Sequence, residues 1–240
     1  MTNGPDLSVV FPVYNEEENI PILLDEIARA LEGTKWSYEI VAVDDGSKDR
    51  SLQVLRESRA KHPALRILAL ETNSGQTAAL DAGWRAARGR YVVSLDADLQ
   101  NDPADIPRML EELETRGVDM IVGVRVDRHD TWWRKMQSKI GNAVRNWITK
   151  DRITDTGCSL KMARREALER VRLYTGMHRF LPTLVRLEGH SVAEIPVRHR
   201  PRRYGVSKYG AINRAFRGLV DCFAVRWMRS RALRYKAREE

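Results

Sequence analysis

The sequence predicts an α/β fold, a mostly parallel, twisted sheet with helices on both faces, followed by a C-terminal amphipathic helix. Three observations carry this prediction. Short apolar runs alternate with segments of helical periodicity. Polar side chains follow successive apolar runs, as at the ligand-binding edge of open α/β sheets. The 240 residues are enough for one large domain with a buried core.

The predicted elements follow one another along the chain in a regular order. Apolar runs predict strands over 7–11, 38–43, 67–70, 91–95 and 120–124. Apolar residues at helical spacing predict a first helix over 20–31, which Gly33 ends. Further helices are predicted around 52–55, over 76–87, after Pro103 and after the fifth strand.

Composition limits the partners of the chain. Its formal net charge is +8, which favours polyanions such as nucleic acid, anionic headgroups or phosphorylated substrates. The two cysteines, Cys158 and Cys222, have no metal-ligand spacing and suit a reducing compartment, and we expect neither to be a nucleophile. We also expect neither a signal peptide nor a transmembrane segment.

Polar clusters follow four of the predicted strands. Because the carboxyl ends of parallel strands share one edge of a sheet, these clusters are expected to converge. They comprise Pro12, Tyr14, Asn15 and Glu16; Asp44, Asp45 and Ser47; Asn73 and Gln76; and Asp96 and Asp98. Turn and cap formation explains single members but poorly explains acid-rich ends on successive strands. Neither G-x-G-x-x-G nor a Walker Gly-Lys-Ser/Thr motif occurs at these turns, which disfavours dinucleotide dehydrogenases and P-loop ATPases.

The segment Asp96-Ala97-Asp98 places two carboxylates at a strand end, with Gln100 two residues further on. A hard divalent cation takes oxygen ligands and often shares the phosphate oxygens of a substrate. The pattern therefore indicates a metal and diphosphate site. Because such short acidic motifs are common, a solvated loop is the alternative at this point.

Several motifs together resemble glycosyltransferase family 2, whose members have the GT-A fold. They are the segments 9–16, 43–47, 73–75 and 96–100. Two further segments, Asp155-Thr156-Gly157-Cys158 and the basic run 200–208, resemble the polyprenyl-phosphate glycosyltransferases of the dolichol-phosphate mannosyl synthase type. Since the resemblance covers about residues 7–210, we predict a catalytic domain over 1–210 and a basic amphipathic helix over 211–240.

The resemblance implies a donor site for a nucleotide sugar and a divalent cation. Mg²⁺ or Mn²⁺ would be held by Asp96, Asp98 and Gln100. The donor would contact Pro12, Tyr14, Glu16, Asp44, Asp45, Gln76, Asp96 and Ala97. Arg202 and Lys208 would clamp the diphosphate from a basic loop in which Gly205 provides a hinge. A solvated loop or a nucleic-acid patch is the alternative interpretation of that basic run.

The resemblance also implies an acceptor site. Arg125, Arg134 and Ser138 match the family's positions for the phosphate of a polyprenyl phosphate. Since that phosphate is already an anion, it can attack the anomeric carbon directly and with inversion. Asp155 lies where hydroxyl-accepting relatives place a base, and a catalytic, structural or donor-sugar role stays open. Four further cations are interpreted as solvated helix surface: Arg128, Lys135, Lys139 and Arg145.

The resemblance therefore predicts a metal-dependent inverting glycosyltransferase acting on a polyprenyl or dolichyl phosphate. The first expectation for the donor is GDP-mannose; the alternative is a UDP-sugar carrying glucose, an N-acetylhexosamine or an aminopentose. A rival is a non-enzymatic basic module that binds membrane or nucleic acid. Carboxylates at four strand ends disfavour that module, because they would repel a polyanion, and we expect no nucleic-acid partner.

The C-terminal segment suggests how the chain reaches its lipid. Apolar residues recur near helical spacing between arginines: Phe216, Leu219, Val220, Phe223, Trp227 and Met228. A basic amphipathic helix of this kind can lie in a bilayer interface. We expect a cytoplasmic protein, peripheral on the cytoplasmic face of the membrane. Packing against the catalytic domain or against a separate integral-membrane subunit is the alternative.

Overall fold

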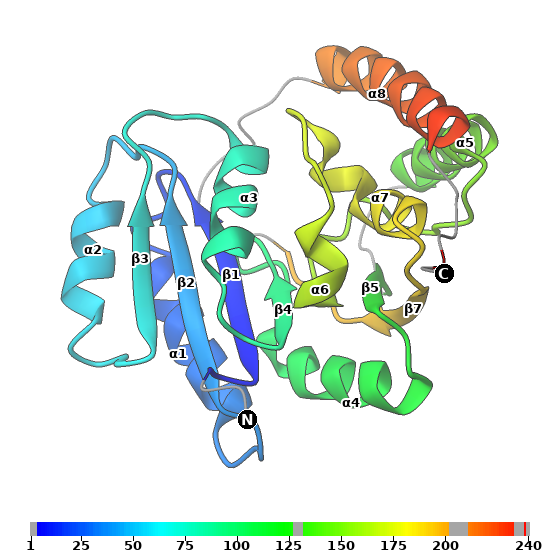
Figure 1. The fold of residues 1–240 in the computed structure, drawn as a ribbon. Helices are drawn as coiled ribbons and strands as arrows, with labels where there is room; N and C mark the ends of the chain where they lie inside the picture. The colour runs from blue at the N-terminus through cyan, green and yellow to red at the C-terminus, as the bar shows by residue number, and fades with distance from the viewer. Residues whose placement is uncertain (1–3, 127–131, 202–210, 233–237, 239–240) are drawn as a thin grey trace.

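The computed structural model describes residues 4–126, 132–201, 211–232 and 238, with backbone alone over 132–140 and 211–217 (Figure 1). Two predicted diphosphate ligands, Arg202 and Lys208, lie outside the described residues. The predicted acceptor residues Arg134 and Ser138 lie in a helix whose side chains are not described there. Their roles therefore stay predictions.

The sheet has seven strands in the order β3-β2-β1-β4-β6-β5-β7. The strands are β1 Leu7–Val13, β2 Tyr38–Asp44, β3 Leu65–Ala69, β4 Tyr91–Ser94, β5 Met120–Arg125, β6 Lys161–Arg164 and β7 Val192–Val197. β6 runs antiparallel to β4 and β5, and the other pairings are parallel. The predicted mostly parallel sheet is confirmed, with its five strands displaced by no more than two residues at any end. β6 and β7 were not predicted.

Helices cover both faces of this sheet, as predicted (Figure 1). α1 Ile20–Leu31 and α4 Ile106–Arg116 pack on one face, and α3 Gln76–Ala86 and α7 Leu181–Leu187 pack on the other. The remaining elements are α2 Ser51–Ser58, α5 Trp132–Thr149, α6 Arg165–Glu169, α8 Ala211–Arg231 and the 3₁₀ turns η1 Pro103–Asp105 and η2 Met177–Phe180. Among the described helices, none combines the length and apolar character that crossing a bilayer requires.

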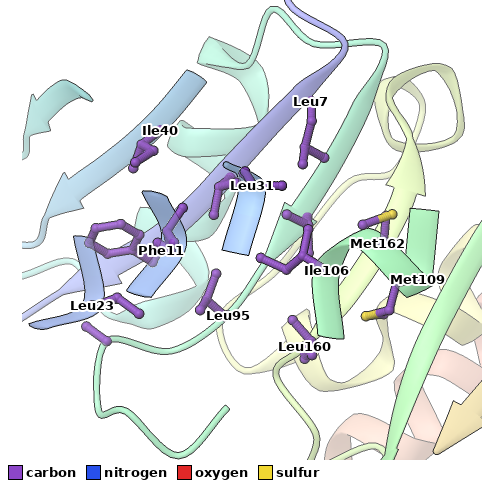
Figure 2. Close-up of a cluster of buried hydrophobic side chains, with 14 of the residues drawn as sticks. Leu7, Phe11, Leu23, Leu31, Ile40, Leu95, Ile106, Met109, Leu160 and Met162 are labelled. Carbon is purple, nitrogen blue, oxygen red and sulfur yellow. The ribbon is translucent and has the colours of Figure 1, made fainter. Parts of the chain in front are cut away.

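Strand β1, inside the sheet between β2 and β4, anchors the core, because its side chains are buried on both faces of the sheet. Leu7 and Phe11 pack on the α1 and α4 side, where Leu23 and Ile106 meet them (Figure 2). Val10 points to the opposite face, toward α3. Burying each such side chain stabilises the fold by roughly 1.5–3 kcal/mol. The sheet is therefore a rigid platform for the side chains at its carboxyl ends.

Close packing of α3 fixes the start of that helix against the sheet. A Cβ atom added at Gly83 would lie 2.4 Å from Val10 Cγ1 and 3.0 Å from Val43 Cγ2, so only glycine permits this approach. The first residue of α3 is Gln76, which therefore sits close to the strand ends.

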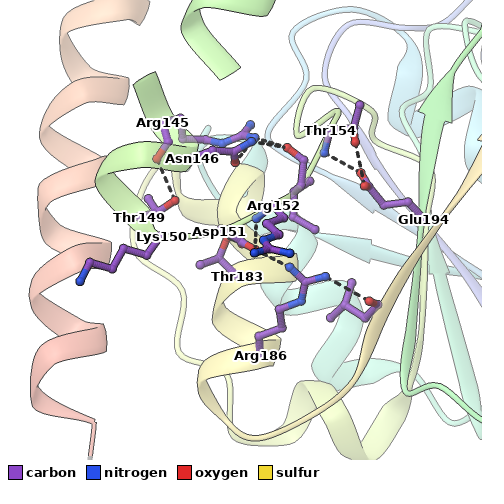
Figure 3. Close-up of polar contacts among 12 residues, drawn as sticks. Arg145, Asn146, Thr149, Lys150, Asp151, Arg152, Thr154, Thr183, Arg186 and Glu194 are labelled. Carbon is purple, nitrogen blue, oxygen red and sulfur yellow. Dashed lines mark hydrogen bonds and ion pairs between the residues drawn. The ribbon is translucent and has the colours of Figure 1, made fainter. Parts of the chain in front are cut away.

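Buried polar contacts connect α5 to the sheet through the segment 150–156 (Figure 3). Arg145 of α5 is 7% exposed and donates to the Ile153 carbonyl and the Thr156 hydroxyl. Thr154 is held by Glu194 of β7 through bonds of 2.8 and 2.9 Å. The interpretation of Arg145 as solvated surface was therefore wrong, since its guanidinium fills a buried site rich in carbonyl and hydroxyl acceptors.

Candidate active site

A cavity of about 300 Å³ lies at the carboxyl ends of β1, β2, β4 and β5. Its lining includes most of the predicted site residues, namely Pro12, Tyr14, Glu16, Asp45, Gln76, Asp96, Ala97, Asp98, Gln100 and Arg125. Asp44 and Asp155 do not line it. The predicted convergence is confirmed, because the segments that follow β1, β2, β3 and β4 each contribute at least one lining residue, Asn73 being the one after β3.

The acidic tip after β4 is a tightly structured turn. Asp96 Oδ1 accepts a hydrogen bond of 2.7 Å from Gln76 Nε2, which fixes its carboxylate at the start of α3. Asp98 is 6% exposed, and its Oδ1 accepts from the Gln100 amide at 3.1 Å. Leu99 between them has a left-handed backbone with φ of 61° and is buried. Asp96, Ala97 and Asp98 line the cavity, whereas the buried Leu99 does not.

The donor atoms of this turn suit a hard divalent cation. Asp96, Asp98 and Gln100 supply carboxylate and carboxamide oxygens, the ligands that Mg²⁺ and Mn²⁺ prefer. Among the described residues, no group of three or more His, Cys, Asp or Glu side chains could hold a metal by itself. The turn therefore fits a cation that takes the rest of its ligands from water and substrate phosphates, as Mg²⁺ does.

The two acids after β2 differ in their surroundings. Asp45 lines the cavity, and its carboxylate accepts from the amides of Ser74 at 2.7 Å and Gly75 at 2.9 Å. It thereby shapes the loop that leads into α3. Asp44 is 2% exposed and accepts from Ser47 N at 3.3 Å, and its buried Oδ1 has no hydrogen-bond partner among the described residues. Donor contacts of both acids stay predictions.

Arg125, at the end of β5, forms a two-pronged ion pair with Asp155. Arg125 Nε donates to Asp155 Oδ2 at 2.7 Å, and its terminal nitrogen donates to Oδ1 at 2.9 Å. The two side chains are 16% and 8% exposed. A Cβ atom on Gly157 would lie 2.6 Å from the Arg125 terminal nitrogen, so glycine makes room for the guanidinium. Both oxygens of Asp155 thus serve to orient Arg125.

The lining residues that were not predicted as site residues include Asn101, Ser159, Arg179 and His199. A β-bridge joins Asn101 to His199, and the Ser159 hydroxyl donates to Asn101 Oδ1 at 2.6 Å. They come together because β6 and β7 return the chain to the site, and neither strand was predicted. Arg179 follows His178 in a segment that, by the family resemblance, could approach the donor, and the lining confirms that this segment lies at the site. Asn101, Ser159 and His199 are isolated polar residues in the sequence, so no local signal distinguishes them.

Arg200 begins the basic run at a fixed point beside the site. It donates to Glu26 of α1 at 2.9 Å and pairs with Asp102 at 2.7 Å. Burial acts to raise the pKa of Asp102, but hydrogen bonds from the Ala104 amide and from Arg200 outweigh burial and lower that pKa. The base of the predicted diphosphate-clamping segment is therefore anchored to the catalytic fold.

Cys158 directly follows the segment Asp155-Thr156-Gly157 and is buried, with its thiol 3.9 Å from the Leu160 carbonyl. Burial raises the pKa of its thiol to about 11. The thiol therefore stays protonated at neutral pH, which agrees with the expectation that it is no nucleophile.

The strand order and the position of this cavity are those of a GT-A fold, and comparisons with solved structures show that fold. A mannosyltransferase from Pyrobaculum calidifontis, solved with GDP-Man and Mn²⁺, superposes with a TM-score of 0.67 at 23% identity, over 93% of this chain and 64% of that one. Glucosyl-3-phosphoglycerate synthase from Mycobacterium tuberculosis, solved with Mn²⁺, UDP and glucosyl-3-phosphoglycerate, superposes with a TM-score of 0.68 at 20% identity. The match covers 94% of this chain and 80% of that one. At these identities the likeness shows the fold.

The sequence comparisons give the family. The description Glycosyl transferase family 2 matches residues 8–172, and the chain belongs to that family. It is 42% identical, over 99% of its length, to a dodecaprenyl-phosphate galacturonate synthase from Rhizobium johnstonii. It is 39% identical, over 85% of its length, to an undecaprenyl-phosphate 4-deoxy-4-formamido-L-arabinose transferase from Edwardsiella ictaluri. The chain spans 71% of the first relative and 63% of the second.

Proposed function

We propose that this protein transfers a sugar from a nucleoside-diphosphate donor to the phosphate of a polyprenyl phosphate. One observation carries the proposal: a single cavity joins the acidic turn Asp96–Gln100 to the cation Arg125. A diphosphate leaving group needs a cation held by carboxylates, and an anionic acceptor needs a positive side chain. The relatives named for dodecaprenyl and undecaprenyl phosphate support the same acceptor class.

Asp96, Asp98 and Gln100 would hold Mg²⁺ or Mn²⁺ in this reaction. A divalent cation there stabilises the negative charge that develops on the β-phosphate as the glycosidic bond breaks. Gln76 keeps the Asp96 carboxylate in place through its hydrogen bond of 2.7 Å. Structural relatives solved with Mn²⁺ support this metal use.

On the acceptor side, Arg125 would bind the lipid phosphate. Asp155 orients that guanidinium through two hydrogen bonds, and an attacking phosphate needs no base because it carries its own negative charge. We therefore assign Asp155 a positioning role in place of the catalytic one. Direct attack predicts a product with inverted configuration at the anomeric carbon.

The donor sugar is best sought among UDP-sugars. The two relatives above are named for galacturonate and for an aminoarabinose derivative, whereas the mannosyltransferase neighbour supports only the fold. Our first expectation, GDP-mannose, thus becomes the second donor to test. The experiment is a screen of UDP-sugars and GDP-mannose with Mn²⁺ and a short polyprenyl phosphate, following lipid-linked product. The proposal fails if no donor gives that product.

We further propose that α5 and α8 present a membrane-facing surface at the cytoplasmic side. In α8, Leu219, Val220, Phe223 and Trp227 are 41–64% exposed and lie within an arc of about 100° by helical geometry, opposite the buried Cys222 and Val225. Trp147 of α5 is 76% exposed. Arginines of α8 lie beside this apolar face, an arrangement suited to anionic headgroups.

Flotation with anionic vesicles tests this surface. Phe223→Ser with Trp227→Ser should lower vesicle binding severalfold while leaving the thermal midpoint unchanged, because both side chains are solvent-exposed. Undiminished flotation of the double variant would indicate instead that a protein subunit or another part of the chain provides attachment.

A further inference from the structure

A second cavity, of about 400 Å³, lies on the inner side of the donor site. It shares part of its lining with the first cavity, including Asp96, Arg125 and Arg179, so the two spaces adjoin. The remaining walls come from α3, the β4 end, β6 and η2, and include Leu80, Trp84, Ser94, Lys161 and His178. A sugar whose diphosphate lies at the acidic turn can therefore reach this inner cavity.

Lys161 places a buried cation in the inner cavity. As the first residue of β6 it lies between Ser94 of β4 and Val122 of β5, and it is 6% exposed. Its ammonium donates to the Cys158 carbonyl, and within the described part of the chain it forms no ion pair with a carboxylate. Burial lowers its pKa. A buried ammonium hydrogen-bonded to a carbonyl is costly; the charges of Asp96 and Asp155 offset part of that cost, and a bound anion would offset more of it.

His178 and Arg179 add donors to the same wall. The Thr77 hydroxyl accepts from Gly176 N at 2.9 Å and shares a hydrogen bond of 2.7 Å with His178 Nδ1, whose direction depends on the tautomer of the ring. The ring is neutral, because burial lowers the pKa of His178 to about 3, with the charges of Lys161 and Arg179 acting in the same direction. The neutral ring carries a single N–H, on Nδ1 or on Nε2. The positive charges of Lys161 and Arg179 therefore both act on the part of the inner cavity beside His178.

We propose that the inner cavity binds a carboxylate on the donor sugar, as in a hexuronic acid, with Lys161 and Arg179 as its recognition cations. The inference rests on the proposed transfer from a nucleotide sugar. A wall that contains two cations supplies charged hydrogen-bond donors, which suit carboxylate oxygens better than a hydroxymethyl group. The carboxylate specifies the donor and takes no part in bond breaking.

The test compares UDP-galacturonate with UDP-galactose, which differ only in the acid group. Wild-type protein should prefer the uronate by about tenfold or more in kcat/KM, the size expected for a charged hydrogen bond. Lys161→Met and Arg179→Gln should each remove most of this preference, and Lys161→Arg should keep it. Arg172→Gln changes an exposed arginine outside both cavities and should behave as wild type.

Direct binding of the two donors separates this inference from the proposed function. Lipid product formed equally well from UDP-galactose would overturn the inference and leave the transfer reaction standing. A second outcome would support the inference while the proposed transfer reaction fails. In that outcome neither donor gives product, UDP-galacturonate still binds about tenfold more tightly than UDP-galactose, and Lys161→Met removes this difference in binding. Equal binding of both donors, or equal losses for both in Lys161→Met and Arg179→Gln, would overturn the inference.

Discussion

The two halves of the sheet differ in the charge that they bring to the shared cavity. The first half, β1 to β4, contributes carboxylates from Glu16, Asp45, Asp96 and Asp98. The second half contributes Arg125 from β5 and Arg179 from η2, with Lys161 of β6 behind them. The contrast matches a reaction between two anionic substrates. Carboxylates suit a metal-bound diphosphate on one side, and cations suit a phosphate and a carboxylate on the other.

The largest effect should come from removing the metal side. Asp98→Asn keeps the shape of the turn but removes a ligand charge, so we expect a loss of about a hundredfold or more in kcat/KM for sugar transfer. Asp81→Asn is the matched control, because Asp81 lies on α3 outside both cavities and pairs with Arg85. Near-normal turnover in Asp98→Asn would remove the metal assignment.

The next effect should come from the cationic side. Asp155→Asn replaces one of the two accepting oxygens by an amide nitrogen that only donates, so one hydrogen bond to Arg125 is lost and the other loses its charge. We expect a loss of about tenfold to a hundredfold in kcat/KM for the lipid phosphate. The change should appear mainly in the KM for the lipid, with the KM for the donor little altered. If instead kcat falls, both KM values hold and the pH–rate profile loses a limb, Asp155 acts as a base.

Arg145 tests whether the second half depends on buried polar contacts for its stability. Arg145→Met leaves the Ile153 carbonyl and the Thr156 hydroxyl without their donor, and we expect the free energy of unfolding in urea to fall by about 3 kcal/mol. Arg152→Met, at an exposed position nearby, should stay within about 0.5 kcal/mol of wild type. Equal values for the two variants would contradict this structural role.

His178 should give the smallest effect, visible only below neutral pH. Its folded pKa of about 3 lies below the unfolded value, so the unfolded chain binds the proton first as the pH falls. The contribution of the neutral His178 ring to the free energy of unfolding is complete above pH ~6.5. It is lost progressively toward pH ~3, by up to about 1.4 kcal/mol per pH unit. Urea unfolding of His178→Gln at pH 7, 6 and 5 should show a shallower decline than wild type. If the free energy of unfolding falls equally with pH in His178→Gln and in wild type, the His178 ring is exposed to solvent and this account of its burial is wrong.

The contrast between the halves also explains what the sequence predicted. β1, β2 and β4 are buried on both faces, so each appears as a continuous apolar run with polar residues directly after it. In β6 and β7 that pattern is interrupted by Lys161, Arg164, Glu194 and Pro196, and neither strand was predicted. Ser159, just before β6, and His199, just after β7, were therefore missed as site residues. The ion pair of Arg125 with Asp155 depends on tertiary structure that no local pattern encodes.

The most direct test of the account compares a polyprenyl phosphate with the matching uncharged polyprenol as acceptors, using one active UDP-sugar and Mn²⁺. The account holds that cations in the second half of the sheet bind the acceptor phosphate, which attacks with its own negatively charged oxygen. Only the polyprenyl phosphate should then receive the sugar, and the product should show inversion at the anomeric carbon. Comparable transfer to the polyprenol would contradict the account, because a hydroxyl acceptor would need a base that Asp155, held by Arg125, does not provide.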